Sequence, residues 1–198
     1  MREQQYARSD MSTKRPATYE DLLAVPEHLV AEIIDGELVT SPRPAPRHAD
    51  AGSGLGAEVR LAFDRGRGGP GGWRIIAEPE LHLGGDVLVP DIAGWRRARL
   101  PHLPGVAYFP LAPDWVCEVL SASTAALDRG KKLRIYARES VHHVWLVDPL
   151  AQCVEVLRRD GAEWLLIGVV HGQGSLRAEP FEAIDIDLTS LWDEPPPS

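Results

Sequence analysis

The sequence has few cysteines, no long apolar run and no excess of positive charge, and each absence excludes a class of protein. Cys117 and Cys153 are too few for a disulfide scaffold, and they lack the spacing of zinc ligands. No stretch approaches the roughly 20 apolar residues of a membrane span. Residues 1–16 are polar and do not resemble a signal peptide. We therefore expect a cytoplasmic protein with reduced thiols and no membrane association.

The balance of charge is negative. The chain carries 21 Lys and Arg against 29 Asp and Glu, a formal net charge of −8. A chain with this charge has no global attraction for nucleic acid or for an anionic membrane. Any site for a polyanion must therefore be a local patch or must depend on bound cations.

The length of 198 residues suits one globular domain with a substantial core. We expect residues 1–16 to form a disordered lead, because they are polar and mixed in charge. Residues 193–198, which include three consecutive prolines, are predicted to form a flexible tail. Residues 17–192 contain no repeat and no linker, so we predict a single domain over this range.

The N-terminal part predicts a short helix, a hairpin and a longer helix. Thr18 and Asp21 form a capping-box-like start for a helix that runs to about Leu29. Asp35-Gly36 separates two β-prone runs, which is a strong signal for a two-residue hairpin. A helix is predicted from about His48 to Asp64, although three glycines weaken its first turns.

The rest of the chain predicts mainly strands. One further helix is predicted over 124–139 and a loop over 96–113. The strands are predicted at 73–78, 80–83, 86–95, 114–120, 141–147, 153–158, 164–170 and 183–188. The run 114–120 is apolar on both faces, which indicates a central position in the sheet. The predicted class is α/β (α+β), with a mixed, mainly antiparallel sheet flanked by helices.

Two carboxylates have unusual surroundings. Asp91 follows Pro90 within an apolar run, and a proline in a strand marks an edge or a bulge that can aim Asp91 toward a cleft. Glu118 lies inside the apolar strand 114–120, where an unpaired carboxylate is costly to bury. If the two strands are neighbours, these carboxylates can present their oxygens to one point. Magnesium binds such oxygens, together with water and substrate phosphate.

A lysine on the following helix is the third candidate. Asp128, Lys132 and Tyr136 are four residues apart, so they lie along one stripe of the predicted helix. This stripe can lay Lys132 over the end of the Glu118 strand. A lysine in that position can orient an attacking water and offset charge in the transition state.

Each of these residues also has an ordinary structural interpretation. Asp91 can cap a turn, and Glu118 can form a salt bridge with a lysine or arginine. Lys131 and Lys132 can belong to a solvated helix face. Glu32 can be an exposed cross-strand charge in the hairpin.

Ordered motifs along the chain favour the functional interpretation. They are Glu32-Ile33-Ile34-Asp35-Gly36-Glu37-Leu38, Ser41-Pro42 with His48, Pro90-Asp91, Glu118-Val119-Leu120-Ser121, Asp128-Arg129-Gly130-Lys131-Lys132 to Tyr136, and Trp145-Leu146-Val147-Asp148-Pro149. Together they resemble the Uma family, long catalogued as a domain of unknown function and a branch of the PD-(D/E)XK restriction-endonuclease-like superfamily. The resemblance covers roughly residues 18 to 192.

The resemblance implies a restriction-endonuclease-like core with a Mg²⁺ site at Asp91 and Glu118, where Mn²⁺ can substitute. It also implies a supporting acid from the first hairpin region, which falls on Glu32. The superfamily places its lysine two residues after the acid, but that position here is a leucine. The family pattern moves the lysine to the next helix, where it falls on Lys132 rather than Lys131.

Further residues complete the predicted site. Glu80 is a candidate metal ligand, because the acidic and histidine side chains of residues 78–82 share one strand face near the Asp91 strand. Arg96 and Arg97 are expected to contact substrate phosphates, which positions a nucleic acid without reading its sequence. His48 is expected to touch substrate near the cleft.

We therefore predict a hydrolase, specifically a metal-dependent endonuclease that cleaves nucleic acid, with DNA as the expected substrate. The apolar late strands and the family resemblance indicate a homodimer. One alternative is a non-catalytic module that binds nucleic acid or protein, which the net charge of −8 and the missing Glu-x-Lys favour. A third interpretation is a hydrolase of a small phosphorylated substrate, which would have a closed pocket in place of an open cleft.

Overall fold

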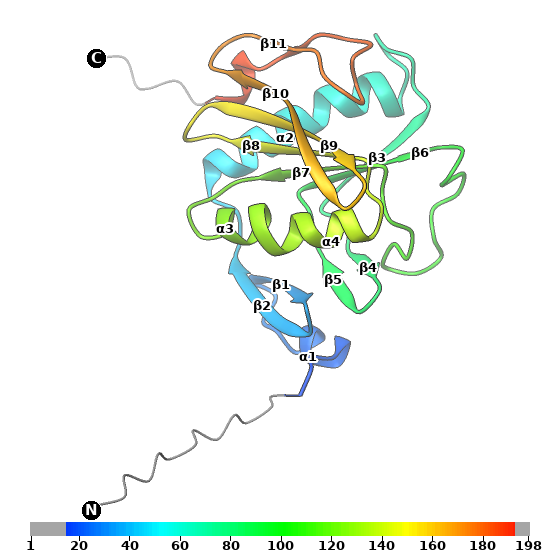
Figure 1. Ribbon diagram of the computed structural model, residues 1–198, viewed down its shortest axis with the longest axis vertical. Coiled ribbons are helices and arrows are strands. Elements are labelled where there is room, and N and C mark those ends of the chain that lie inside the picture. The colour runs from blue at the N-terminus through cyan, green and yellow to red at the C-terminus, as the bar shows by residue number, and fades with distance from the viewer. Residues whose placement is uncertain (1–14, 193–198) are drawn as a thin grey trace, which may run out of the picture.

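The computed structural model describes residues 15–192, which form two main β-sheets and flanking helices (Figure 1). Residues 1–14 and 193–198 lie outside the described residues, and they hold most of the predicted lead and the whole predicted tail. Arg15, which we assigned to the lead, forms an ion pair of 2.8 Å with Asp21. No helix in the described part of the chain is long and apolar enough to cross a membrane.

The N-terminal helix α1 (Tyr19–Leu23) has the predicted capping box, in which the side chains and backbone amides of Thr18 and Asp21 are bonded reciprocally. The helix is shorter than predicted and ends before Leu29. The cause is Pro26, because the residue before a proline avoids the helical conformation.

A four-stranded sheet follows α1 and has the order β2-β1-β5-β4. Its strands are β1 (Leu29–Ile34), β2 (Glu37–Pro42), β4 (Leu81–Leu83) and β5 (Asp86–Leu88). The predicted hairpin is confirmed, since Asp35 and Gly36 connect β1 to β2 with φ angles of 53° and 76°. Both central residues of this two-residue turn are left-handed, which matches the twist of the strands.

The larger sheet has six strands in the order β10-β9-β8-β7-β6-β3. Its strands are β3 (Trp73–Ala77), β6 (Ile92–Arg96), β7 (Trp115–Val119), β8 (His143–Asp148), β9 (Cys153–Asp160) and β10 (Glu163–His171). Every pair is antiparallel except β7 with β8. All five residues of β7 are buried, as the sequence predicted for a central strand. The predicted mixed, mainly antiparallel α/β class is confirmed.

Helices cover both faces of the six-stranded sheet (Figure 1). On one face lies α2 (Pro46–Val59), which continues into the π-helical turn η1 (Arg60–Asp64) and packs on a tryptophan-rich core. The other face carries one helical segment made of α3 (Ala125–Leu127), η2 (Asp128–Lys132) and α4 (Leu133–Arg138). This segment connects the parallel strands β7 and β8, because parallel neighbours need a crossover and not a tight turn.

One of the three glycines that weaken the predicted start of α2 has a packing role. A Cβ atom at Gly54 would lie 2.9 Å from Leu191, whereas those at Gly52 and Gly56 would make ordinary contacts with Val119 and Ile92. Gly54 therefore lets α2 pack closely against the C-terminal turn that contains Leu191. This close packing offsets the lower helix propensity of glycine.

The predicted strand 86–95 is wrong as one element, because the chain changes sheets at Pro90 and Asp91. Strand β5 pairs with β1 and β4 in the smaller sheet, whereas β6 pairs with β3 and β7 in the larger one. Proline cannot donate to a β-ladder, so the break falls where the backbone has lost a donor.

The C-terminal part is less regular than predicted. The strand expected at 183–188 is only β12 (Ile186–Asp187), which pairs with β11 (Ser175–Leu176) and precedes the 3₁₀ turn η3 (Thr189–Leu191). Side chains of this segment, including Phe181, pack into the core beneath α2. The segment therefore closes one face of the six-stranded sheet.

Candidate active site

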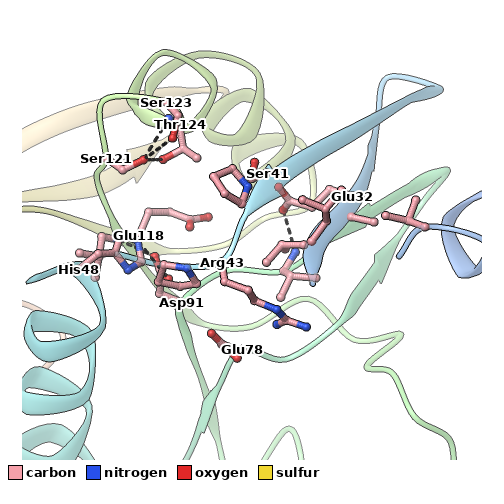
Figure 2. Close-up of a pocket in the computed structure, with 18 of the residues that line it drawn as sticks. Glu32, Ser41, Arg43, His48, Glu78, Asp91, Glu118, Ser121, Ser123 and Thr124 are labelled. Carbon is pink, nitrogen blue, oxygen red and sulfur yellow. Dashed lines mark hydrogen bonds and ion pairs between the residues drawn. The ribbon is translucent and has the colours of Figure 1, made fainter. Parts of the chain in front are cut away.

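A cavity of about 580 Å³ lies between the β1–β2 hairpin and the ends of β6 and β7. Figure 2 shows that side chains from distant parts of the chain point into it. Acidic residues dominate its charged lining: Glu27, Glu32, Glu78, Glu80, Asp91, Glu118 and Asp128. The basic side chains of the lining are only Arg43 and Lys132, with His48 beside them. The cavity therefore has a strongly negative wall.

Asp91 and Glu118 lie next to each other because of the β6–β7 register. Ile92 pairs with Cys117, so the same antiparallel register sets Asp91 opposite Glu118. The Oδ2 atom of Asp91 accepts a hydrogen bond of 2.6 Å from the backbone N–H of Val119. This bond fixes the Asp91 carboxylate at the end of β7. Both carboxylates therefore line the same cavity.

Lys132 lies over Glu118 from the neighbouring helix. Its Nζ atom is 2.9 Å from Oε1 of Glu118, 3.2 Å from Oε1 of Glu32 and 3.4 Å from Oδ1 of Asp128. The Lys132 side chain is only 4% exposed, whereas Lys131 points outward and forms a 2.7 Å ion pair with Glu37. Of the two lysines, the fold therefore brings Lys132 to the site.

Two residues absent from the predicted site support this arrangement. Asp128 is the third carboxylate around Lys132, and Tyr136 donates a hydrogen bond of 2.5 Å to Oε1 of Glu118. The four-residue spacing of Asp128, Lys132 and Tyr136 was the sequence signal that pointed to both. The predicted stripe is confirmed, although the turn Asp128–Lys132 is π-helical.

Glu32 is buried and does not have the exposed position of an ordinary hairpin charge. Besides its contact with Lys132, its Oε1 atom accepts a hydrogen bond of 2.8 Å from the backbone N–H of Val89. The residue lies on β1 of the smaller sheet, and Val89 lies where the chain leaves that sheet. Glu32 therefore joins the smaller sheet to the site.

Burial and charge perturb the protonation of the central groups. Burial raises the pKa of Asp91, Asp128 and Glu118, and Lys132 partly opposes this effect on each carboxyl. Burial by itself would lower the pKa of Lys132, but Glu118 and Glu32 hold it well above its usual value. Lys132 therefore stays protonated at neutral pH.

His48 and Arg43 lie at the cavity wall. The Nε2 atom of His48 is 3.5 Å from Oδ1 of Asp91, so the structure places this predicted substrate contact beside a central carboxylate. Arg43 lies in the same view (Figure 2) and donates a hydrogen bond of 2.7 Å to the carbonyl of Glu27. Three hydroxyl groups complete this part of the lining: Ser121, Ser123 and Thr124.

Glu80 lines the cavity but is committed to other partners. Its Oε1 atom accepts a hydrogen bond of 2.8 Å from the Tyr19 hydroxyl and lies 2.7 Å from Nε2 of His82. The predicted common strand face of residues 78–82 is wrong, because Glu78 has a left-handed backbone with φ of 45° and β4 begins only at Leu81. Within residues 15–192, Glu80 does not form a group of metal ligands with Asp91 and Glu118, so its role as a ligand stays a prediction.

Arg96 and Arg97 are not among the residues that line the cavity. They lie at the other end of β6, about 16 Å from Asp91 at the usual rise of a strand. The guanidinium of Arg96 lies 4.2 Å from the centre of the Trp73 ring, and Arg97 forms an ion pair of 2.5 Å with Asp64. The structure thus places both arginines outside the cavity, and their contact with substrate phosphates stays a prediction.

Asp91 and Glu118 form a donor set that fits a small divalent cation. Within residues 15–192, no three His, Cys, Asp or Glu side chains are grouped to hold a metal ion by themselves. Magnesium needs fewer protein ligands, since one or two carboxylates with water and substrate phosphate suffice. The hydrogen bonds and ion pairs of Glu118 among the described residues go through Oε1, which leaves Oε2 available.

The balance of buried charge supports the same fit. If ionised, the carboxylates of Glu32, Asp91, Glu118 and Asp128 face the single ammonium of Lys132. This leaves an excess of negative charge on largely buried side chains, and buried charge is costly without a counter-ion. A divalent cation would offset most of this excess.

Comparisons with known proteins agree with this geometry. The sequence model of the Uma2 family, described as "Putative restriction endonuclease", matches residues 16–189. A solved structure described as "a putative nuclease belonging to DUF820" from Anabaena variabilis ATCC 29413 is similar in fold, with a TM-score of 0.72 and 24% sequence identity. The alignment covers 89% of this chain and 98% of that chain. No curated protein matches the chain significantly.

Proposed function

Because this chain belongs to the Uma2 family, described as a putative restriction endonuclease, we propose that it is a metal-dependent endonuclease of the PD-(D/E)XK type. The proposed reaction is hydrolysis of a phosphodiester bond in nucleic acid, with DNA as the substrate. The observation that carries the proposal is the register that sets Asp91 opposite Glu118, with the ammonium of Lys132 2.9 Å from Glu118.

Asp91 and Glu118 are the residues that would hold Mg²⁺, or Mn²⁺ in its place. When bound, such an ion stabilises negative charge on the phosphoryl group and makes a neighbouring water molecule more acidic. Hydrogen bonds within the protein orient both carboxylates. The Val119 N–H fixes Asp91, and the Tyr136 hydroxyl fixes Glu118.

Lys132 acts in this proposal as a fixed positive charge. Its pKa lies well above the usual value because Glu118 and Glu32 surround its buried ammonium. A lysine that stays protonated cannot take a proton from water at neutral pH. Its fixed positive charge can offset charge that develops in the transition state.

Glu32 and Asp128 are positioning residues for Lys132. Their carboxylates lie 3.2 Å and 3.4 Å from its Nζ atom, and each comes from a different element. A lysine side chain has several rotatable bonds, so three fixed acceptors are needed to hold its amine in one place. His48 and Arg43 are the proposed substrate contacts, because they lie at the wall of the same cavity.

Cleavage assays on site variants test the proposal. Purified protein is incubated with plasmid DNA, single-stranded DNA and RNA in Mg²⁺ or Mn²⁺, with EDTA as the metal-free control. We expect metal-dependent cleavage that Asp91→Asn and Glu118→Gln abolish. Lys132→Met should lower the rate by about 10²- to 10³-fold, as for other groups that stabilise developing charge.

Lys131→Met is the matched control, because it removes the adjacent lysine, whose partner is the exposed Glu37. Thermal melting verifies that each variant is folded. Absence of cleavage in both metals for every nucleic acid would overturn the proposal. Cleavage that survives in Asp91→Asn would overturn the assignment of the site.

The negative lining of the cavity favours one alternative, a module that binds a partner without cleaving it. Calorimetric titration with Mg²⁺ and Ca²⁺ separates the two functions. Saturable binding that Asp91→Asn removes supports the metal site, whereas no binding supports a remnant. Turnover of a small phosphodiester in the absence of any DNA cleavage would favour a small-molecule hydrolase. In either hydrolytic case, we propose that the protein works in the cytoplasm.

A further inference from the structure

Two arginine-rich segments lie together at the end of the six-stranded sheet that faces away from the catalytic cavity. Residues 65–77 and 92–113 contain six arginines and no acidic residue. They are neighbours because β3 pairs with β6, and because the N–H of Arg97 donates a hydrogen bond of 2.9 Å to the carbonyl of Gly72. No residue of either segment lines the cavity. In a chain with a net charge of −8, this concentration of positive charge needs an explanation.

Two of the six arginines have structural roles. Arg74 donates hydrogen bonds to the carbonyls of Leu100 and Pro101. Arg99 forms an ion pair of 2.7 Å with the buried carboxylate of Asp114. Both interactions hold the loop after β6 against the sheet, so they explain these two arginines and leave four others.

Arg65 and Arg67 lie in the glycine-rich loop before β3. Both residues are exposed, and their side chains form no hydrogen bond or ion pair within residues 15–192. Gly66 and Gly68 have φ angles of 65° and 74°, which glycine adopts without strain. This loop therefore presents two unpaired positive charges to solvent.

Arg96 and Arg97 lie beside the same loop. Arg96 is exposed, and its guanidinium lies over the Trp73 ring. The Arg97 side chain is 42% exposed and contacts Asp64 through one of its nitrogens. Because a guanidinium has five N–H donors, both side chains can bind further acceptors.

We propose that these four residues bind the phosphate backbone of a nucleic-acid duplex at a site separate from the catalytic cavity. The choice of nucleic acid as the partner rests on the proposed function. The four residues form what we call the arginine surface: Arg65, Arg67, Arg96 and Arg97. A planar guanidinium can donate to two phosphate oxygens at once, and such contacts position a duplex without reading its sequence.

The charge of the cavity explains why a second site is needed. Seven acidic residues line the cavity, against the basic side chains of Arg43 and Lys132. A duplex carries about one negative charge per 1.7 Å of its axis, so this cavity by itself has little attraction for it. The elements beside the arginine surface carry some acids, among them Asp64, Glu58 and Glu182, and the four guanidinium groups outnumber these three. The arginine surface can therefore supply attraction that the cavity lacks.

The separation of the two sites favours a polymer over a small substrate. Arg96 lies about 16 Å from Asp91 at the usual rise of a strand. Phosphates of one strand of a duplex are about 3.4 Å apart along its axis, so this distance corresponds to about five nucleotides. A dinucleotide held at Asp91 could not reach the arginine surface, whereas a longer duplex could contact both sites.

Duplex binding without metal tests the arginine surface. Fluorescence anisotropy with a labelled duplex of about 20 base pairs is measured in EDTA between about 50 mM and 200 mM salt. We expect a double variant with Arg65→Gln and Arg67→Gln to bind about 10-fold more weakly at 0.1 M salt. The slope of log K against log salt should fall by about 2, because each lost phosphate contact removes about one from it.

A second double variant, with Arg129→Gln and Arg134→Gln, is the matched control. It removes the same charge from the crossover helix, where the two guanidinium groups are paired with Glu155 and Asp35. We expect its duplex binding to stay close to that of the wild type, and thermal melting verifies that both double variants are folded. Equal losses in the two double variants would mean that only net charge matters and would overturn the proposal. A wild type that does not bind the duplex would overturn it as well.

Two further measurements separate this inference from the proposed function and from another partner. Because binding is measured in EDTA, Asp91→Asn should bind the duplex no more weakly than the wild type. Arginine-dependent binding without any cleavage would sink the proposed nuclease and support the arginine surface, whereas cleavage with binding indifferent to Arg65 and Arg67 would sink only the arginine surface. Binding to phosphatidylserine vesicles in preference to the duplex would contradict the choice of nucleic acid.

Discussion

At the scale of single residues, the site depends on hydrogen bonds that hold each charged group in place. Glu118 is buried in the middle of an apolar sheet and has two donors, the Tyr136 hydroxyl and the Lys132 ammonium. When one partner of a buried charge is removed, that charge loses part of the compensation for its burial. The geometry of Glu118 should therefore be sensitive to Tyr136, although Tyr136 would not touch substrate.

The first prediction concerns this positioning role. Tyr136→Phe should lower the cleavage rate by about 10- to 100-fold, the usual effect of losing a group that orients a metal ligand. It should also raise the Mg²⁺ concentration needed for half-maximal cleavage, because Glu118 loses the donor that fixes its carboxylate. Cleavage rates over a Mg²⁺ titration measure both effects.

Tyr19→Phe is the control for this prediction. It removes the hydroxyl that bonds to Glu80, a carboxylate that lines the same cavity but is not assigned to the proposed metal site. We expect its cleavage rate and Mg²⁺ dependence to match the wild type. An equal loss in both tyrosine variants would show that Glu80 belongs to the metal site after all.

At the scale of elements, strand β6 matters because it carries Asp91 to the end of β7. It lies between β3 and β7, and large side chains press on its backbone from both neighbours. A Cβ atom at Gly94 would lie 3.0 Å from Ile75 and 3.2 Å from the Trp115 ring. Gly94 is therefore needed for packing and has no strained backbone.

The second prediction is that Gly94→Ala destabilises the protein by about 1–3 kcal/mol, the usual cost of an added methyl group in a packed core. Gly85→Ala is the control, because a Cβ atom at Gly85 would meet no other atom within 4 Å. Urea denaturation followed by tryptophan fluorescence measures both variants. A value for Gly94→Ala equal to that of Gly85→Ala would mean that the neighbouring rings move aside.

Local signals predicted several elements correctly. The capping box at Thr18 and the Asp35-Gly36 turn act within a few residues, so their effect can be recognised without the rest of the chain. The prediction of one strand over 86–95 was wrong because its error depends on residues far away in the chain. Both halves are β-prone, and only the partners of each half show that they belong to different sheets.

At the scale of the whole molecule, a polar cluster attaches the C-terminal segment to the six-stranded sheet. Glu179 lies 3.0 Å from Nε2 of His143 on β8 and 2.9 Å from a guanidinium nitrogen of Arg158 on β9. Its carbonyl also accepts a hydrogen bond of 2.8 Å from the Trp145 indole. The cluster lies beside the core that α2 covers.

The third prediction follows from the protonation of this cluster. Burial lowers the pKa of His143, and the hydrogen bond from His143 lowers the pKa of Glu179. In both cases the unfolded chain binds protons at a higher pH than the folded chain, so stability rises with pH. The free energy of unfolding should therefore fall as the pH drops below about 6.5, the ordinary pKa of histidine.

Thermal melting between pH 5 and pH 8 measures this dependence. His143→Gln should show a smaller fall of the melting temperature on acidification, because the amide cannot titrate and can still donate to Glu179. His102→Gln, in the loop after β6, serves as the control and should keep the wild-type dependence. The same slope in His143→Gln and the wild type would assign the acid sensitivity to other groups.

The sequence by itself determined the fold class, the main elements and the identity of the central residues. Asp91, Glu118 and Lys132 could be selected because an acid within an apolar strand and a four-residue spacing on a helix are local patterns. The family resemblance added Glu32, which no local pattern separates from an exposed hairpin charge.

Only the tertiary structure decided which of these groups meet. In the structure, Lys132 lies among three carboxylates. Glu80 contacts Tyr19 and His82, and Arg96 and Arg97 lie at the far end of β6. The physical reason is that side-chain partners such as Glu32 and Lys132 are 100 positions apart in the chain. Their distance depends on how two sheets and a crossover helix pack, and local preference along the chain does not encode that packing.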